Sequence, residues 1–295
     1  AADSRHRGHM RDVLMKMLGD MHQDRKPFCY LMPASPAIYR PFGFRYIFDQ
    51  PQYRLGSEAK ECLQRRELRL DGNLCSSLAG WMNHWLSSRY QVYALRDRDY
   101  MEMLQSELDS EAGSVYGWYD VSGSLQAFQA FWGREKQEQR FLYAGRDRWL
   151  EPDSGQHAPR PAIMARITDV RSFMEAIVLD EGCPCPAMDV MVNIHDPLIP
   201  GNSGLWRWKI DGNGSSLTKK GVSLPKIHTG ECAEEPDYPG TLVSTEVLDI
   251  TIEQLASWLF GYSALEELAE GEQNGAPFWS AYVQVLDGVY LDEVV

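Results

Sequence analysis

Residues 4–11, SRHRGHMR, combine arginines, histidines and a glycine at the point where a helix is predicted to begin. The first N–H groups of a helix have no intrahelical partner and the helix dipole is positive there, so such an end favours an anion. Gly8 allows the backbone to approach a phosphate closely. The guanidinium groups of Arg5, Arg7 and Arg11 can add charge-assisted hydrogen bonds. The stretch therefore predicts a phosphate site, with a merely basic helix start as the alternative.

A tyrosine in the stretch PAIYRPFGFRY, residues 36–46, is the second candidate. Prolines on both sides restrict the backbone around Tyr39. A phenol held in place can protonate a departing thiolate, which makes Tyr39 a candidate general acid. The alternative is that Tyr39 only packs against Phe42 and Phe44. Ser35, just before this stretch, can cap the following turn or donate to a ligand.

The cysteines and histidines predict no metal site. Six cysteines in 295 residues are too few for a disulfide scaffold, which favours a reduced, cytoplasmic setting. Cys183 and Cys185 form the one close pair, and zinc would need two further ligands at suitable spacing. His6 and His9 have no carboxylate or cysteine at zinc spacing, so exposed polar positions are expected for them. His195 is expected to be a turn residue or a satisfied polar group.

The composition predicts a globular protein of two or three domains. The chain has 295 residues, of which 44% are apolar, enough for a sizeable core. The net charge is −13 without a basic stripe, which argues against nucleic acid as a partner and would suit a cationic substrate. No apolar run has the length of a membrane span, and the first residues lack the apolar stretch of a secretory signal.

The first 60 residues predict a helix followed by two strands. Residues 9–22 form an amphipathic helix, residues 28–32 a buried strand and residues 45–49 a second strand. The apolar side chains of the helix recur at the spacing of one buried face. They are Met10, Val13, Leu14, Met17, Leu18 and Met21.

The middle of the chain predicts a mixed α/β unit between about residues 60 and 150, after a charged connecting stretch at 56–70. Its clearest element is a hairpin at 114–132, whose apolar strands flank Ser-Gly-Ser. The other elements expected are helices at 73–88 and 98–108 and a strand at 90–95.

After a linker at 151–161 the pattern changes to a second α+β region. Asp169 is expected to cap a helix at 169–176, and Trp206 and Trp208 to lie inward on a hairpin at 205–219. The remaining elements expected are a short apolar stretch at 162–168, strands at 188–194, 245–250 and 278–286, and a helix at 252–260.

Together these features resemble a known family. SRHRGHMRDVL resembles the acetyl-CoA pyrophosphate loop, R-x-x-G-x-G/A, of GCN5-related N-acetyltransferases (GNAT), with Met10 replacing the usual small residue. The succession of a helix, FCYLM, PAS and IYRPFGF is similar to the enhanced-intracellular-survival (Eis) branch. The resemblance implies that Tyr39 is the general acid and that Ser35 lies beside the coenzyme. It also implies a coenzyme-binding loop of Arg5, His6, Arg7, Gly8, His9, Met10 and Arg11.

The resemblance extends over the whole chain and implies a mixed α/β (α+β) fold of three parts. Residues 1–58 would be the C-terminal part of an N-terminal GNAT domain, residues 59–155 a central GNAT-like domain, and residues 160–295 a domain of sterol-carrier-protein-2 (SCP2) type. The family's C-terminal carboxylate serves as a base, which implies that role for Val295. The first strands of the family's N-terminal domain have no counterpart here, so only part of the acceptor pocket is expected.

The expected function is therefore an acetyl-CoA-dependent N-acetyltransferase that transfers directly to an amine, on a small molecule or a protein lysine, without a metal. The resemblance also implies a homo-oligomer. One alternative is a carrier of lipids or small hydrophobic molecules, which would need an open apolar cavity within residues 160–290. Another is a scaffold whose active partner is a different subunit.

Overall fold

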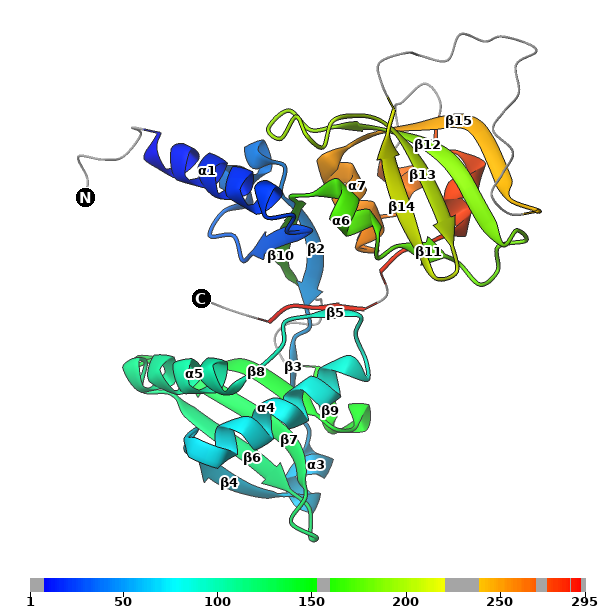
Figure 1. Cartoon of the computed structure of the whole chain (residues 1–295). Coiled ribbons are helices and arrows are strands. Elements are labelled where there is room, and N and C mark those ends of the chain that lie inside the picture. The colour runs from blue at the N-terminus through cyan, green and yellow to red at the C-terminus, as the bar shows by residue number, and fades with distance from the viewer. Residues whose placement is uncertain (1–7, 153–159, 221–238, 269–274, 287, 293–295) are drawn as a thin grey trace, which may run out of the picture. The chain divides into compact units, whose positions relative to one another are not determined.

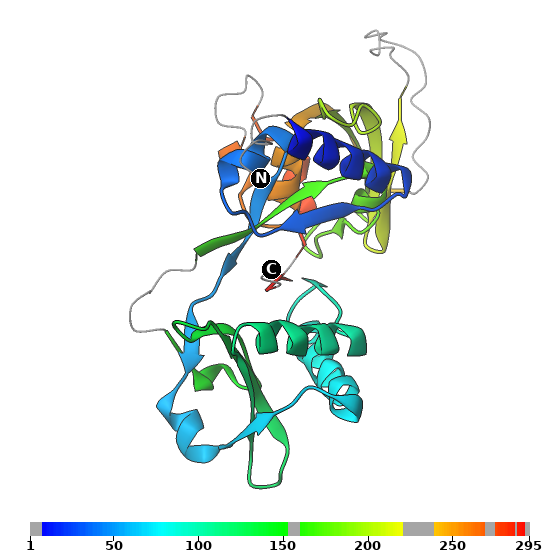
Figure 2. The same ribbon diagram turned by 90° about the vertical axis from the view of Figure 1, so that its left-hand side faces the viewer.

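The structure is a computed structural model, and it describes residues 8–152, 160–220, 239–268, 275–286 and 288–292. The chain divides into two compact units (Figures 1 and 2). Unit 1 comprises residues 1–47 and 163–287, and unit 2 comprises residues 48–162 and 288–295. Both mix helices with β-sheet, which confirms the mixed α/β class expected from the sequence.

A three-stranded sheet organises the beginning of unit 1. The chain runs through α1 (His9–Gln23), β1 (Phe28–Leu31), α2 (Pro36–Tyr39), η2 (Arg40–Phe42) and β2 (Arg45–Gln50). The middle strand of the sheet is β10 (Arg160–Ile167), which lies between β1 and β2. It pairs antiparallel with β1, from Phe28 opposite Ile167 to Leu31 opposite Met164. A strand far away in sequence therefore completes this sheet.

Helix α1 buries less of its apolar face than its pattern predicts. Leu18 is buried, and Leu14 and Met21 are partly buried. Met10, Val13 and Met17, however, are 48%, 60% and 47% exposed. The prediction of one continuous buried face is wrong for these three residues, because the described packing partners of α1 cover only the side around Leu18.

The second part of unit 1 is a four-stranded sheet with helices packed against it (Figure 1). Its order is β14-β13-β12-β15, with β12 parallel to β15 and antiparallel to β13. The bounds are β12 (Ala187–His195), β13 (Gly204–Asp211), β14 (Gly214–Lys219) and β15 (Leu242–Thr251), and the helices are α6 (Val170–Met174), α7 (Ile252–Leu259) and α8 (Leu265–Leu268). The core is built around buried tryptophans, Trp206, Trp208, Trp258 and Trp279.

Local signals placed most of these elements correctly. Asp169 caps α6 as expected, because its carboxylate accepts a hydrogen bond from the Ser172 N–H at 2.8 Å. The strand predicted at 278–286 is wrong. This stretch forms the 3-10 helix η4 (Phe278–Tyr282) and then the short β16 (Val283–Gln284), which pairs with β11 (Val178–Leu179). Trp279 is buried in the core from this helical turn, whereas its neighbour Phe278 is exposed.

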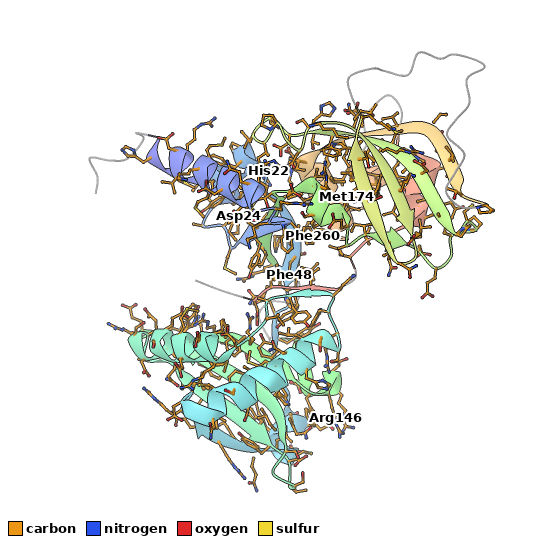
Figure 3. All side chains as sticks on the ribbon, in the orientation of Figure 1. His22, Asp24, Phe48, Arg146, Met174 and Phe260 are labelled. Carbon is orange, nitrogen blue, oxygen red and sulfur yellow. The ribbon has the colours of Figure 1, made fainter. Side chains whose placement is uncertain are left out.

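Aromatic rings join the two parts of unit 1. The Phe28 ring on β1 lies 5.1 Å from that of Phe260, at the end of α7, and 6.0 Å from that of Phe173 in α6. Figure 3 shows Phe260 and Met174 among the side chains of this unit. The first segment is therefore continuous with the core of the last one.

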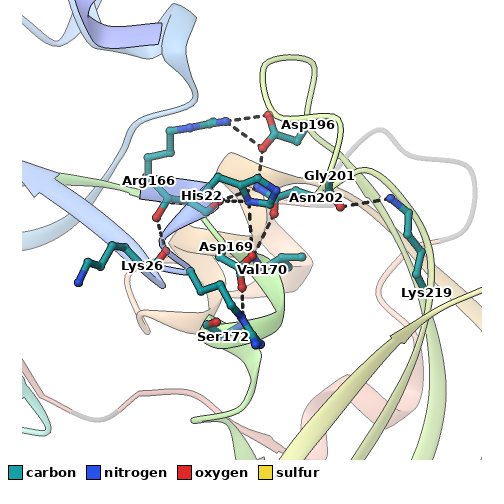
Figure 4. Close-up of polar contacts among 12 residues, drawn as sticks. His22, Lys26, Arg166, Asp169, Val170, Ser172, Asp196, Gly201, Asn202 and Lys219 are labelled. Carbon is teal, nitrogen blue, oxygen red and sulfur yellow. Dashed lines mark hydrogen bonds and ion pairs between the residues drawn. The ribbon is translucent and has the colours of Figure 1, made fainter. Parts of the chain in front are cut away.

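A buried polar cluster, drawn in Figure 4, makes a second connection. The Arg166 guanidinium on β10 donates to both Asp196 carboxylate oxygens, at 2.7 and 2.8 Å, with both side chains fully buried. The Asn202 amide donates to Asp196 and to the Thr168 carbonyl. The His22 ring, at the end of α1, lies 3.0 Å from the same carbonyl. These bonds hold α1 and β10 against the loop at 196–202.

Unit 2 is an antiparallel sheet of order β4-β6-β7-β8 with two helices on one face (Figure 1). The strands are β4 (Gln64–Leu68), β6 (Ser114–Tyr119), β7 (Leu125–Trp132) and β8 (Glu138–Ala144), and the helices are α4 (Gly72–Ser87) and α5 (Arg98–Ser110). The hairpin and both helices confirm the sequence predictions. Smaller elements are β3 (Tyr53–Leu55), α3 (Ser57–Cys62), β5 (Val92–Tyr93), η3 (Asp147–Trp149), β9 (Leu150–Pro152) and β17 (Val289–Tyr290).

Two predictions for unit 2 need correction. The charged stretch at 56–70 is not a simple connector, because it forms α3 and the sheet strand β4. Side chains on β4 are mostly exposed, so a charged sequence is compatible with an outer strand. The strand expected at 90–95 is limited to β5, whose two residues pair with β17.

Candidate functional site

The start of α1 has the geometry of an anion site. Gly8 occupies the N-cap position with φ of 82°, a left-handed conformation that glycine adopts without strain. An added Cβ would meet no described atom within 4 Å, so the backbone there is open to approach. His9, Met10 and Arg11 are exposed, and their N–H groups belong to the unpaired first turn of the helix. Arg5, His6 and Arg7 lie outside the described residues.

The turn that carries Tyr39 is tightly shaped. Ser35 holds the N-cap position of α2, yet its hydroxyl makes no capping hydrogen bond, so it remains available to a ligand. After α2 the chain tightens into η2 and ends at Gly43, whose φ is 77°. The Tyr39 ring is partly buried and meets the Phe44 ring edge-on, with 6.0 Å between centroids. Tyr39 therefore packs as one sequence interpretation expects, and its role as a general acid stays a prediction.

One hydrophobic cluster supports both candidate segments. Its buried members are Leu18, Phe42, Phe44, Met164 and Ile199, and Leu14 and Tyr39 pack against it. The Arg11 guanidinium carbon lies 5.9 Å from the Phe42 ring centroid. The structure therefore brings the first turns of α1 and the Tyr39 turn onto the same core.

A buried arginine that sequence reasoning missed sets the position of this turn. A Cβ built on Gly43 would lie 2.1 Å from Nη1 of Arg166, so only glycine leaves room for the guanidinium. Arg166 is held by Asp196 on its other side. The available signal was a single charged residue inside the apolar stretch at 162–168. Such a residue inside a buried strand needs a partner, which the sequence does not name.

Cys29 on β1 lies opposite Arg166 on β10, and the reactivity of its thiol tests the surroundings of this arginine. Burial raises the pKa of its thiol to about 11, although the charge of Arg166 acts to lower it. We expect Cys29 to react with iodoacetamide at pH 8 about 100-fold more slowly than an ordinary thiol, because the thiolate is the reactive form. Mass spectrometry of labelled peptides would measure the rate, with the exposed Cys62 as the internal reference.

The same pKa predicts a pH effect on stability. A thiol whose folded-state pKa lies above its usual value of 9.0 resists ionisation in the fold. Its contribution to stability is complete below about pH 9 and is lost as the pH rises towards 11. For the labelling prediction above, equal rates for Cys29 and Cys62 at pH 8 would show that burial does not raise the pKa of the Cys29 thiol.

The remaining candidate groups do not form a further centre. His195 is a satisfied polar group, as expected, because its Nε2 pairs with the Asp249 carboxylate. Cys183 and Cys185 are free thiols. Within the described ranges, no three His, Cys, Asp or Glu side chains gather as metal ligands. None of the helices in the described part of the chain is both long and apolar enough to cross a membrane. Val295 lies outside the described residues.

Two segments of the chain match known protein domains. Residues 1–47 match the acetyltransferase (GNAT) domain, and residues 181–274 match the sterol carrier protein domain. The first match contains all of the described site residues, from Gly8 to Tyr39. A search of curated proteins found no match to the sequence.

Solved structures share the fold at low sequence identity. A GCN5-related N-acetyltransferase from Anabaena variabilis has 14% identity and a TM-score of 0.68, over 99% of this chain and 79% of that one. A probable N-acyltransferase from Enterococcus faecalis has 15% identity and a TM-score of 0.66, over 98% and 79%. Eis1 from Mycobacterium abscessus has 11% identity and a TM-score of 0.60, over 98% and 78%.

These likenesses show a common fold and leave the Eis branch as a suggestion. The chain joins a segment that matches the acetyltransferase (GNAT) domain to a segment that matches the sterol carrier protein domain, and the first match supports an acetyltransferase enzyme.

Proposed function

We propose that the chain carries the coenzyme-binding part of an N-acetyltransferase that passes an acetyl group from acetyl-CoA directly to an amine. The observation that supports this most is the shared cluster under α1 and the Tyr39 turn. Helix α1 and Tyr39 both pack on this cluster, within the part of the chain that matches the GNAT domain.

The first turn of α1 would hold the pyrophosphate of the coenzyme. The backbone at Gly8 is open, and the N–H groups of His9, Met10 and Arg11 point out of the helix end. Arg11 adds charge, and we assign the same role to Arg5 and Arg7, with His6 completing the loop. The hydroxyl of Ser35, which makes no capping hydrogen bond among the described residues, would donate one to the coenzyme.

Tyr39 would donate a proton during the reaction, and Val295 would accept one. As the amine nitrogen bonds to the acetyl carbon, the carbon–sulfur bond breaks and the thiolate takes the Tyr39 proton. The carboxyl group of Val295 would accept the proton that the amine loses, directly or through water. A variant lacking residues 293–295 tests the second role, since an unchanged pH dependence of kcat would exclude it. The acceptor would be an amine on a small molecule or a protein lysine.

Gly8→Asp should weaken coenzyme binding while the protein remains folded. Aspartate is one of the few non-glycine residues that adopt a left-handed backbone, and its charge is favourable at a helix start, so the melting temperature should fall only modestly. The added carboxylate would repel the pyrophosphate, and we expect the affinity for acetyl-CoA to fall roughly tenfold or more. Isothermal titration calorimetry measures this change.

The matched control is Gly19→Asp, further along the same helix, where an added Cβ also meets no described atom within 4 Å. It introduces the same charge away from the helix start and should leave the affinity nearly unchanged. Equal weakening by both substitutions would count against a coenzyme site at the start of α1.

The second candidate function is carriage of a lipid or small hydrophobic molecule, which the match of residues 181–274 to a sterol carrier protein domain favours. Tryptophans from this part and from the following η4 fill a common core, with the ring centroid of Trp208 lying 6.2 Å from that of Trp279 and 6.4 Å from that of Trp258. Titration with a fluorescent fatty acid or sterol tests this candidate. Saturable binding together with no affinity for acetyl-CoA would favour the carrier.

A further inference from the structure

Residues 288–292 belong to unit 2, where two of them form the short strand β17. The two residues of β17 pair in parallel with β5, Val289 with Val92 and Tyr290 with Tyr93 (Figure 1). The N–H groups of Gln91 and Val92 both reach the Gly288 carbonyl, at 2.9 and 3.1 Å. A Cβ on Gly288, whose φ is 68°, would come within 3.0 Å of the Arg89 carbonyl oxygen. The backbone of this segment therefore packs closely against the stretch from Arg89 to Val92.

The side chain of Tyr290 fills an aromatic pocket. Its ring centroid lies 4.6 Å from that of Tyr90, 5.6 Å from those of Trp85 and Phe48, and 6.0 Å from that of Tyr143. Burial raises the pKa of Tyr290 well above its usual value, so its phenol stays neutral. Four rings of unit 2 thus converge on one side chain.

Two side chains bind the carboxylate of Asp292 at the end of this pocket. Arg96 donates to it at 2.6 Å, and the Tyr143 hydroxyl donates to its other oxygen at 2.5 Å. The Arg96 and Asp292 side chains are only 1% and 3% exposed. The backbone N–H and carbonyl of Arg96 are fixed by the Asn83 side-chain amide, at 2.8 and 2.7 Å. A carboxylate buried in this way is tolerated because the charge is paired and hydrogen-bonded.

We propose that unit 2 contains a recognition site for an extended Tyr-x-Asp peptide, and that the chain's own C-terminal segment occupies it. The site has the parts of recognition by strand addition, namely main-chain pairing plus separate pockets for alternate side chains. Tyr290 and Asp292 are alternate residues, which in an extended chain point to the same side. The aromatic pocket takes the first and Arg96 with Tyr143 takes the second.

The test uses the full chain with Tyr290→Ala and Asp292→Ala together, which weakens the bound segment. Hydrogen exchange at the Gln91 and Val92 amides should become at least tenfold faster, because these N–H groups bond to Gly288. Adding the synthetic peptide GVYLDEVV in excess should restore their protection. The same peptide with alanine in place of its aspartate should restore little or none.

A matched control distinguishes release of residues 288–292 from a general loss of stability. Asp196→Ala removes the carboxylate of another fully buried ion pair, in unit 1, and should leave the Gln91 and Val92 amides protected. If the double variant does not fold, Asp292→Asn alone provides the readout, with faster exchange at these two amides and unchanged exchange at the β6–β7 amides. The proposal is overturned if the added peptide restores no protection, or if its aspartate proves irrelevant.

Discussion

Tyr39→Phe is expected to lower kcat for acetyl transfer by about 100-fold or more, with little change in KM for acetyl-CoA. The substitution removes the phenolic proton and keeps the ring, so the edge-on contact with Phe44 persists. The thiolate would then depart without its acid, while coenzyme contacts at the start of α1 remain. Steady-state assays of CoA thiol release by the full-length protein, with an amine acceptor present, measure the effect.

Tyr46→Phe is the matched control. Tyr46 packs against the same cluster as Tyr39 and loses the same hydroxyl, but it lies on β2 outside the turn. It should retain turnover close to that of the unmodified protein. If Tyr39→Phe also retains most of its turnover, Tyr39 is a packing residue and the proposed acid is wrong.

Gly43→Ala is expected to reduce the free energy of unfolding of unit 1 by about 3–5 kcal/mol. The methyl group would sit 2.1 Å from Nη1 of Arg166 at a residue whose φ is 77°. Either the guanidinium must move, which disturbs its buried pair with Asp196, or the Tyr39 turn must open. Native-state hydrogen exchange at the β12–β13 amides in increasing urea measures the loss.

Gly240→Ala tests whether the backbone conformation alone explains such a loss. Gly240 belongs to the same unit and has φ of 86°, but its added Cβ would meet Pro186 at an ordinary 3.6 Å. We expect a cost of about 1 kcal/mol there. Similar losses for both variants would mean that contact with Arg166 contributes little.

Most local elements and the candidate site residues can be predicted from short stretches of the sequence. Apolar residues at helical spacing predicted α1 and α4, and alternating strands around Gly-containing turns predicted the β6–β7 and β13–β14 hairpins. Asp169 predicted its own helix cap. The types and order of Gly8, Arg11 and Tyr39 pointed to an acetyltransferase segment, which the domain match supports. These signals are readable because each one depends on residues only a few positions apart.

How distant segments combine could not be predicted in this way. The position of β10 between β1 and β2 depends on hydrogen bonds to strands that are far away in the sequence. Such pairing leaves no periodic pattern in the sequence. Exposure of Met10, Val13 and Met17 depends on which surfaces are available to cover the helix. The pairing of Arg166 with Asp196 and of Asp292 with Arg96 requires partners brought together by folding, so the need for a partner is visible in the sequence but its identity is not.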